Sequence, residues 1–447
     1  MPQNTPDTQP RAVLVGVQLP GVTDEEHAAS LAELGRLAKT LGLAVAARVS
    51  QKRPALAAAA VIGAGKLKEL ASLTGGRGVV PSGVPAHRAR SEEPEPAEAD
   101  EGVESGERAS VVLVDHDIAP SQARNLERAT GAEVLDRTAV ILAIFQRHAR
   151  SREAVLQVEI ARLAYLAPRL RESGGGQDRQ GGGIGGKGAG ESHLELDRRK
   201  VRDRIAELRR ELTAIEKDAA TRRRRRTAQP TVAIVGYTNA GKSSLMRALT
   251  GSELLVSDQL FATLDTTVRA LQPETKPRIL VSDTVGFIKK LPHDLVASFR
   301  STLEEAREAA LLLHVVDAAD PAFPAQIEVT AQVLAEIDSG DAPRLLLLNK
   351  IDKLDEERRA ALAQAYPQAL LLSAKSAADI AGLRERIIEF FEREMVEDEL
   401  LVPYAQQRVV SEIHASCRVL AEAYDQAGTR LLVRARPEVV ARLRAAL

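Results

Sequence analysis

A lysine and a serine follow a glycine-rich stretch at residues 236–243, and together they can hold a chain of phosphates. Gly236-x-x-x-x-Gly241-Lys242-Ser243 comes directly after the apolar run 232–235. Glycines let backbone N–H groups curl around phosphate oxygens, the lysine reaches the β- and γ-phosphates, and the serine hydroxyl can bind Mg²⁺. The alternative is an ordinary glycine-rich turn, and the pattern alone does not distinguish ATP from GTP. The predicted nucleotide-binding residues here are Gly236, Tyr237, Thr238, Asn239, Ala240, Gly241, Lys242, Ser243 and Ser244.

Further motifs follow strand-like runs in the order that a GTPase requires. In Asp283-Thr-Val-Gly286 the aspartate would hold Mg²⁺ through water and the Gly286 N–H would sense the γ-phosphate. In the motif 349–352 the final carboxylate can accept two hydrogen bonds from the edge of guanine, which adenine cannot supply. The predicted guanine-site residues are Asn349, Lys350, Asp352, Ser373, Ala374 and Lys375. The Ala374 N–H is expected to donate to guanine O6. Together these motifs predict a GTPase domain.

The residues that would act in hydrolysis are less regular. The segment 261–267 is the predicted first switch loop, with Thr267 as the Mg²⁺ and γ-phosphate ligand and Thr263 and Thr266 as rivals. Phe287 stands where many regulatory GTPases carry a water-orienting glutamine, so slow intrinsic hydrolysis is expected. Asn239 can coordinate K⁺ near the phosphates, and the alternative is an asparagine that stabilises a turn. The predicted catalytic residues are Lys242, Thr267, Gly286 and Asn239; the predicted Mg²⁺ ligands are Ser243, Thr267 and, through water, Asp283.

Length and composition exclude several classes of protein. The 447 residues suffice for two to four domains, and 61 basic residues balance 62 acidic ones. The single cysteine, Cys417, excludes an intrachain disulfide and suits a reducing cytoplasm. The N-terminus has no basic-then-apolar signal and no apolar run approaches 18 residues. We expect a cytoplasmic protein without stable membrane insertion, while peripheral membrane association stays open.

The N-terminal part alternates strand-like and helix-like runs, which predicts a small α/β domain. Expected strands are 12–18, 43–50, 110–115 and 132–135; expected helices are 24–41, capped near Thr23, 121–129 and 138–150. Residues 61–66 look like a phosphate loop but lack its full spacing, and they are interpreted as a strand-to-helix turn. Residues 92–107 hold eight acidic residues and no basic one, which predicts a flexible acidic insertion over 75–109.

A basic helical segment connects the two α/β parts. Apolar residues from Val201 to Ile215 recur at spacings of 4, 3, 4 and 3, and those from Leu156 to Leu170 mark a second helix face, so we expect an antiparallel hairpin. Its connection, 173–190, holds ten glycines among eighteen residues. From Phe145 to Pro230, 21 Lys and Arg stand against 12 Asp and Glu, which suits RNA; the alternative is a solvated spacer. The candidate RNA contacts are Lys187, Arg222, Arg223, Arg224, Arg225 and Arg226.

The predicted fold class is α/β: a P-loop GTPase domain with a mixed, mostly parallel sheet, preceded by an N-terminal α/β domain plus a helical hairpin and followed by a small C-terminal α+β domain. The expected boundaries are 1–10 for a disordered tail, 11–150 for the N-terminal domain, 151–226 for the hairpin, 230–396 for the GTPase domain and 397–447 for the C-terminal domain, whose part from 401 is expected to be strand–helix–strand–helix.

The chain resembles the HflX family of ribosome-associated GTPases. The second switch, 283–294, with its hydrophobic replacement of the glutamine, looks like that of the family, as does the first switch, 261–267. In the N-terminal part the resemblance rests on 136–138, 163–169, and 185–191 leading into 197–199, and it extends over roughly 11–74 and 110–447. The chain departs from the family pattern at Thr266, where proline is expected, at the acidic insertion, and at Lys187, Ala189 and Ser192, where Arg, Pro and Thr are more frequent.

The resemblance implies a factor that binds GTP and GDP, the large ribosomal subunit and ribosomal RNA. In its GTP form such a factor helps to split stalled ribosomes, its N-terminal arm reaches toward the peptidyl-transferase region, and hydrolysis promotes release. We expect a monomer. A second hypothesis is a regulatory module in which GTP sets a conformation that docks RNA or protein and hydrolysis is incidental. RNA unwinding has no separate support in the sequence.

Overall fold

The computed structural model describes residues 9–80, 108–173, 193–226, 229–252, 260–261, 267–289, 300–337, 339–393 and 395–447. The chain divides into two compact units, Met1–Arg147 with Val158–Arg209, and His148–Gln157 with Arg210–Leu447. Most of the predicted acidic insertion and glycine-rich tip, including Lys187, lies outside the described residues, as do Thr263 and Thr266. In the described part of the chain no helix is both long and apolar enough to cross a membrane.

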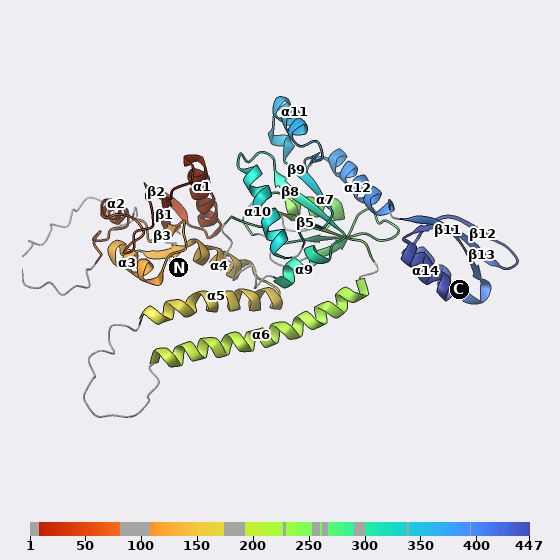
Figure 1. Cartoon of the computed structure of the whole chain (residues 1–447), viewed down its shortest axis with the longest axis horizontal. Coiled ribbons are helices and arrows are strands. Elements are labelled where there is room, and N and C mark those ends of the chain that lie inside the picture. Colours follow the sequence, from red (N-terminus) through yellow and green to blue (C-terminus); the bar gives the residue numbers. More distant parts are fainter. Residues whose placement is uncertain are drawn as a thin grey trace, which may run out of the picture. The chain divides into compact units, whose positions relative to one another are not determined.

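A four-stranded parallel sheet with the order β2-β1-β3-β4 forms the centre of the first unit (Figure 1). Its strands are β1 (Arg11–Gln18), β2 (Ala44–Lys52), β3 (Val111–Val114) and β4 (Glu133–Asp136). Helix α1 (Asp24–Thr40) begins at the expected cap, where Thr23 Oγ1 accepts from Glu26 N and Glu26 Oε2 accepts from Thr23 N. The expected helix 138–150 is α4 (Arg137–His148), which begins one residue earlier and ends two residues earlier than predicted.

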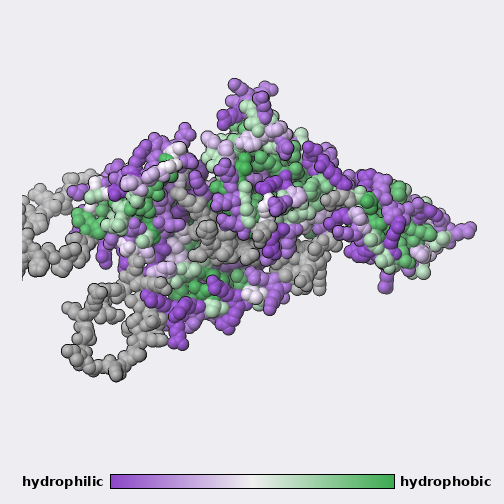
Figure 2. Space-filling model, viewed as in Figure 1, coloured by the Kyte–Doolittle hydropathy of each residue, from purple (hydrophilic) through white to green (hydrophobic). Residues whose placement is uncertain are grey.

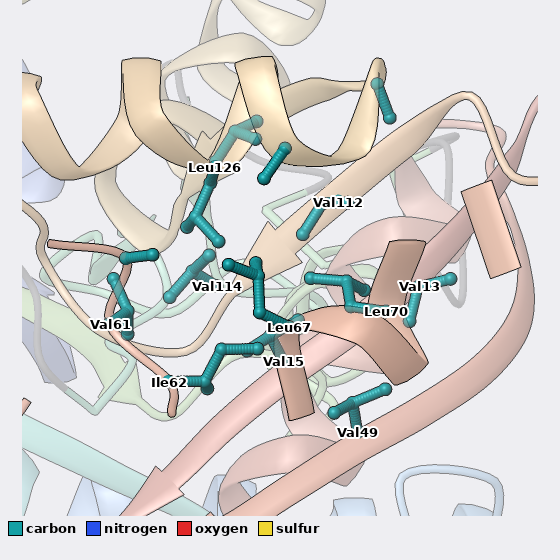
Figure 3. Packing of buried hydrophobic residues seen from close by; sticks show 14 of the residues in the cluster. Val13, Val15, Val49, Val61, Ile62, Leu67, Leu70, Val112, Val114 and Leu126 are labelled. Atoms are coloured by element: carbon teal, nitrogen blue, oxygen red, sulfur yellow. The ribbon is translucent and has the colours of Figure 1, made fainter. Parts of the chain in front are cut away.

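The two faces of this sheet bury alternate residues of β1, because side chains along a strand point to opposite sides. Val13 and Val15 pack in one cluster with residues of α2 (Ala64–Thr74) and α3 (Pro120–Thr130), as Figure 3 shows. Leu14 instead lies near Gly35 of α1. Burial on both faces explains why β1 and β3 of this parallel sheet read as nearly continuous apolar runs.

The loop 61–66 turns into helix α2 as predicted, but an isolated bridge, and not the expected strand, precedes the turn. Val61 forms an isolated bridge with Ala57, and Gly63 N donates to Gln51 Oε1 at 2.9 Å. The ends of the expected insertion, in contrast, belong to the folded domain. Gly78 N donates to Ala129 O at 2.9 Å, and Ala109 is buried in the same core as α2 and α3. The insertion is therefore shorter at both ends than composition indicated.

A buried ionic cluster closes the carboxyl edge of the N-terminal sheet. Arg137 is 1 % exposed, follows β4 directly, and donates to Asp115 Oδ1 at 2.7 Å and to Glu33 of α1. Both carboxylates are also buried. A guanidinium can serve two acceptors at once through its fixed fork of N–H groups. The cluster therefore holds α1 against the ends of β3 and β4.

The neighbouring Asp136 joins a long helix, α5 (Arg152–Ser173), to the same edge. Its Oδ1 accepts from the Tyr165 hydroxyl at 2.7 Å and its Oδ2 from Arg169 at 2.5 Å. The Arg169 guanidinium lies 3.5 Å from the centroid of the Tyr165 ring and also donates to Ile118 O. Tyr165 and Arg169 are four residues apart and therefore share one face of α5. That face fixes the helix to the N-terminal domain.

Helix α6 (His193–Arg226) runs antiparallel to α5 (Figure 1). In the first unit Arg204 pairs with Glu159 at 3.1 Å, and in the second Arg152 pairs with Glu211 at 2.5 Å. Residue numbers therefore rise along α5 while they fall along α6. Leu208, at the centre of the predicted apolar seam, is fully buried. Arg222–Arg226 form the end of α6.

The second unit contains a six-stranded sheet with the order β10-β9-β8-β5-β7-β6, in which only β6 is antiparallel to its neighbour. The predicted mixed, mostly parallel sheet is confirmed. Its strands are β5 (Thr231–Gly236), β6 (Thr267–Ala270), β7 (Leu280–Asp283), β8 (Leu311–Asp317), β9 (Arg344–Asn349) and β10 (Leu370–Leu371).

Helices cover both faces of this sheet. Val232 and Ile234 of β5 pack with α7 (Lys242–Thr250) and α12 (Ala377–Glu392), whereas Ala233 and Val235 pack in the cluster of α9 (Arg300–Glu308) and α10 (Phe323–Glu336). After β9 come the 3₁₀ helix η1 (Ile351–Lys353) and α11 (Glu356–Ala365). The loop after β5 thus lies in the middle of the carboxyl edge, where α/β proteins bind ligands.

The C-terminal domain is an antiparallel sheet, β11-β13-β12, with two helices packed on one face. Its elements are β11 (Val396–Pro403), η2 (Tyr404–Gln406), α13 (Gln407–Ser416), β12 (Arg418–Tyr424), β13 (Gly428–Ala435) and α14 (Pro437–Ala446). The sequence predicted one strand where the structure has two, β12 and β13. A turn at Asp425, whose carboxylate accepts a hydrogen bond from Ala427 N, separates them. Leu401, Leu420 and Leu432 are exposed, and hydrophobic residues are visible on this domain in Figure 2.

Candidate functional site

The loop between β5 and α7 has a backbone that only certain residues tolerate. Gly241 has a φ of +98°, and a Cβ there would lie 2.3 Å from Asn349 Nδ2. A Cβ on Gly236 would lie 2.1 Å from Val315 O. Asn239 has a φ of +60°, which asparagine tolerates better than most residues. The glycine spacing is thus required by close packing, and the loop leads its N–H groups into the N-terminus of α7, a favourable place for phosphate.

Lys242 is the first residue of α7 and its side chain is buried. The amine donates to Tyr237 O at 2.7 Å, and a Cβ on Gly286 would lie 2.9 Å from Lys242 Nζ. Burial lowers the pKa of the Lys242 amine to about 8, although the charge of Asp283 opposes the shift. The structure therefore places a cation, partly disfavoured by burial, between the loop and the glycine of the second switch.

Ser243 and Asp283 bring a hydroxyl and a carboxylate together beside the loop. Ser243 Oγ donates to Asp283 Oδ2 at 2.9 Å. Thr267, the first residue of β6, lies opposite Asp283 in the antiparallel pairing of β6 with β7. Hydroxyl and carboxylate oxygens are ligands that Mg²⁺ accepts, usually with water and substrate phosphates completing the set. The residues present fit such an ion.

The motifs after β9 and β10 surround a second part of the site. Asn349 Nδ2 donates to Ala240 O at 2.8 Å, and its Oδ1 accepts from Ala374 N at 3.0 Å, so the Ala374 N–H bonds to this side chain. Asp352 Oδ1 accepts from Ser373 Oγ at 2.8 Å, and Lys375 lies 3.3 Å from Asp352 Oδ2. The Ser373 hydrogen bond is the main cause that lowers the pKa of Asp352, which keeps this acceptor ionised.

The side chain of Phe287 lies in the core of the GTPase domain. It is 1 % exposed and packs with Val235, Ala306 and Leu334 in the core under the sheet. An aromatic ring in this place cannot orient water by hydrogen bonding. Phe287 therefore does not replace the glutamine that many regulatory GTPases carry at this position.

Comparisons with known proteins agree with this geometry. Residues 231–350 match the model of a 50S ribosome-binding GTPase, residues 148–226 that of a GTP-binding GTPase middle region, and residues 28–80 and 97–146 that of a GTP-binding GTPase N-terminal region. GTPase HflX of Gluconacetobacter diazotrophicus is 59% identical over 446 residues, with 98% of each chain covered.

The chain belongs to the GTPase HflX family. GTPase HflX of Escherichia coli is 45% identical over 310 residues, which cover 68% of this chain and 73% of the relative. A solved structure of a GTP-binding protein from Sulfolobus solfataricus in complex with GDP is 24% identical, with a TM-score of 0.43, and covers 85% of this chain and 98% of that one. Like the HflX proteins that it resembles, the chain is a GTPase.

Two residues at the nucleotide site, Asp317 and Asp379, were not predicted from the motifs. Asp317, the last residue of β8, pairs with Lys350 at 2.7 Å, and Lys350 also donates to Asn239 O at 2.6 Å. Asp379 accepts from Ser373 N at 2.7 Å. The position of Asp317 at a strand end was a usable signal. The pairing of Asp379 with Ser373 had no such signal, because five residues of turn and helix lie between them.

Proposed function

We propose that this chain is a GTP-driven factor that binds the large ribosomal subunit and splits or rescues stalled ribosomes. The observation that carries the proposal is that residues 231–350, which contain the phosphate loop, match a 50S ribosome-binding GTPase model. The domain is joined to a long helical pair with a basic end. RNA phosphates supply affinity for such a surface. We therefore expect the arm to contact ribosomal RNA through Lys187 and Arg222–Arg226. We expect the protein to act as a monomer.

The contacts described above suggest a role for each part of the site. Backbone N–H groups of 237–244 hold the phosphates, Lys242 pairs with the β- and γ-phosphates, and Gly286 N–H meets the γ-phosphate. Asp352 accepts from guanine, aided by the motif 349–350 and by 373–375. Ser243, Thr267 and, through water, Asp283 would hold Mg²⁺, which neutralises phosphate charge when bound. Ion pairing of Lys350 with Asp317 positions the loop carbonyl of Asn239.

Hydrolysis by the isolated chain should be slow, because Phe287 is buried in the core and cannot orient water. A large partner would then supply the missing contacts. Asn239 is a second source of help: its exposed side chain could place K⁺ beside the phosphates. The positive φ of Asn239 equally suits an asparagine chosen for its turn.

The first test is GTP hydrolysis by the full chain, alone and with purified large ribosomal subunits. Stimulation of at least about tenfold, or roughly 1.4 kcal/mol in the barrier, is expected. An unchanged rate with tight GTP-dependent binding would favour the docking module, and absence of binding would refute the ribosomal partner. Asn239→Gly keeps the backbone conformation and removes the amide. The potassium role fails if wild type hydrolyses GTP equally in Na⁺ and K⁺, or if Asn239→Gly keeps the difference.

The second test concerns the arm. Reversing the charge of Arg222–Arg226 should weaken binding to large subunits and reduce the dependence of affinity on salt. Arg358→Glu, an exposed arginine of α11 in the GTPase domain, is the matched control and should leave binding unchanged. Equal affinity of the charge-reversed variant and of the control would remove the arm from the proposal.

A further inference from the structure

The P-loop residue Tyr237 has a side chain that phosphate binding does not require. The residue between Gly236 and Thr238 contributes its backbone N–H to the phosphate loop. Any small side chain at this position would allow that contact. Here the side chain is a large phenol, 5 % exposed. Its hydroxyl accepts a hydrogen bond from Lys289 N at 2.6 Å. The tyrosine therefore connects the phosphate loop to the second switch, past the glycine of that motif.

Backbone hydrogen bonds join the same two segments. Tyr237 forms a parallel bridge with Phe287, in which Thr238 N donates to Phe287 O at 2.7 Å and Phe287 N donates to Gly236 O at 3.1 Å. An isolated bridge, shifted by one residue from the register of β5 and β7, thus joins the two segments beyond the strands. Phe287 is also anchored by its side chain in the core. Residues 287–289 are fixed to the loop at two points, the bridge at Phe287 and the phenol at Lys289.

Gly286 immediately precedes this fixed segment. The direction of the Gly286 N–H therefore depends on the position of 287–289. The space around the glycine is narrow: a Cβ would lie 2.9 Å from both Lys242 Nζ and Thr238 Cγ2. Lys242 in turn donates to the carbonyl of Tyr237. One residue therefore contacts the lysine through its backbone and the second switch through its hydroxyl.

We propose that the Tyr237 hydroxyl positions the Gly286 N–H for the γ-phosphate and so favours GTP over GDP. Tyr237 is then a positioning residue, and this inference rests on the proposed contact between Gly286 and the γ-phosphate. GDP has no γ-phosphate and cannot use that contact. A loss of the hydroxyl should therefore change the affinity for one nucleotide and not for the other.

The test compares Tyr237→Phe with wild type in the full chain, using a non-hydrolysable GTP analogue and GDP. One net hydrogen bond corresponds to about a three- to tenfold effect. We expect the affinity for the analogue to fall by this factor, and the affinity for GDP to change less than about twofold. Tyr404→Phe is the matched control, because its hydroxyl donates to Asp425 O at 2.8 Å in the C-terminal domain. Amide exchange of 284–289 should also become faster in Tyr237→Phe alone.

The remaining outcomes overturn the proposal. Equal losses for the analogue and GDP would show that the phenol merely supports the loop, and unchanged or tighter analogue binding would exclude positioning. Gly286→Ala separates the inference from its premise. If Gly286→Ala weakens the binding of the analogue and of GDP equally, the glycine contact itself is wrong. If Gly286→Ala weakens only the binding of the analogue and Tyr237→Phe weakens neither, only the role of the hydroxyl is lost.

Discussion

The N-terminal domain and the GTPase domain both carry polar residues at the carboxyl edge of a parallel sheet. In the first, Arg137 bonds to Asp115 and Glu33, and Asp136 bonds to Tyr165 and Arg169. These groups connect the sheet to helices α1 and α5. In the second, the polar groups surround a loop whose glycines permit close approach of a ligand. The same edge serves as a joint in one domain and as a nucleotide site in the other.

This difference teaches what topology can and cannot decide. The carboxyl edge of an α/β sheet is the usual place for a ligand, so both edges qualify by fold. The side chains decide between them. A buried arginine between two carboxylates satisfies charge inside the protein, whereas a buried lysine that bonds to a carbonyl beside a glycine loop keeps a cation for phosphate. Substitution of each cation by methionine should therefore have opposite consequences.

The largest expected effect is that of Arg137→Met. It leaves two buried carboxylates without their cation, which costs about 3–5 kcal/mol of stability. Amide exchange of β3 in the full chain should accelerate accordingly, while GTP hydrolysis stays within about twofold of wild type. Lys52→Met, which breaks the exposed pair with Asp24, is the control and should leave exchange unchanged. Unaltered protection of β3 in Arg137→Met would mean that the cluster does not hold this edge.

Lys242→Met should show the reverse pattern. Loss of the cation removes charge stabilisation from the transferring phosphate, and kcat/KM for GTP should fall by about 10²–10³, or roughly 3–4 kcal/mol. Stability should not fall, because burial already disfavours the charged amine. Exchange of β5 and GTP turnover measured on the same sample decide the matter. A destabilised variant would show that Lys242 is a structural cation like Arg137.

Much of the nucleotide site could be predicted because its chemistry demands residue types at short spacings. A phosphate loop and a guanine-reading carboxylate are local patterns, and the fold class followed from the strands between them. The burial of Phe287 could be expected from its residue type, because a phenyl ring cannot form hydrogen bonds with water. The apolar spacing along 156–170 and 201–215 indicated the helical hairpin, and the resemblance to the family extended to the C-terminal domain.

Contacts between distant segments could not be predicted in this way. Nothing local pairs Tyr237 with Lys289 or Asp136 with Tyr165, because each bond depends on how two elements meet in space. The Arg137 cluster joins residues more than a hundred positions apart in sequence. The missing strand of the C-terminal sheet has a local cause, the tight turn at Asp425, and composition alone concealed it.

A smaller effect is expected from Tyr165→Phe at the joint of the N-terminal domain. The substitution removes a hydrogen bond to a buried carboxylate, worth about 1.5–3 kcal/mol. Burial raises the pKa of the Tyr165 hydroxyl, so it stays protonated and donates at all ordinary pH values. Exchange of α5 residues 158–170 should accelerate, and nucleotide affinity should not change. Tyr424→Phe, which loses an exposed contact with Glu422, is the control. Equal exchange in both variants would contradict a role in holding the arm.

The smallest expected effect is the pH dependence of GDP affinity, which depends on the charge of Lys242. Lys242 has a pKa of about 8 in the folded chain, below the 10.5 of an ordinary lysine. Phosphate binds the charged amine, so binding above pH 8 must be accompanied by proton uptake. GDP affinity should therefore fall about tenfold from pH 7 to pH 9, or about 1.4 kcal/mol.

Stability should move the opposite way over a neighbouring range. Between pH 8 and 10.5 the unfolded chain binds the proton that the folded chain has released from Lys242, so the contribution of this residue to the free energy of unfolding rises with pH. Lys242→Arg keeps its proton throughout, and its GDP affinity should show only the titration of guanine itself. The difference between the wild-type and Lys242→Arg profiles isolates the amine. Parallel profiles would show that the lysine stays charged over this range of pH and would contradict an effect of burial on its pKa.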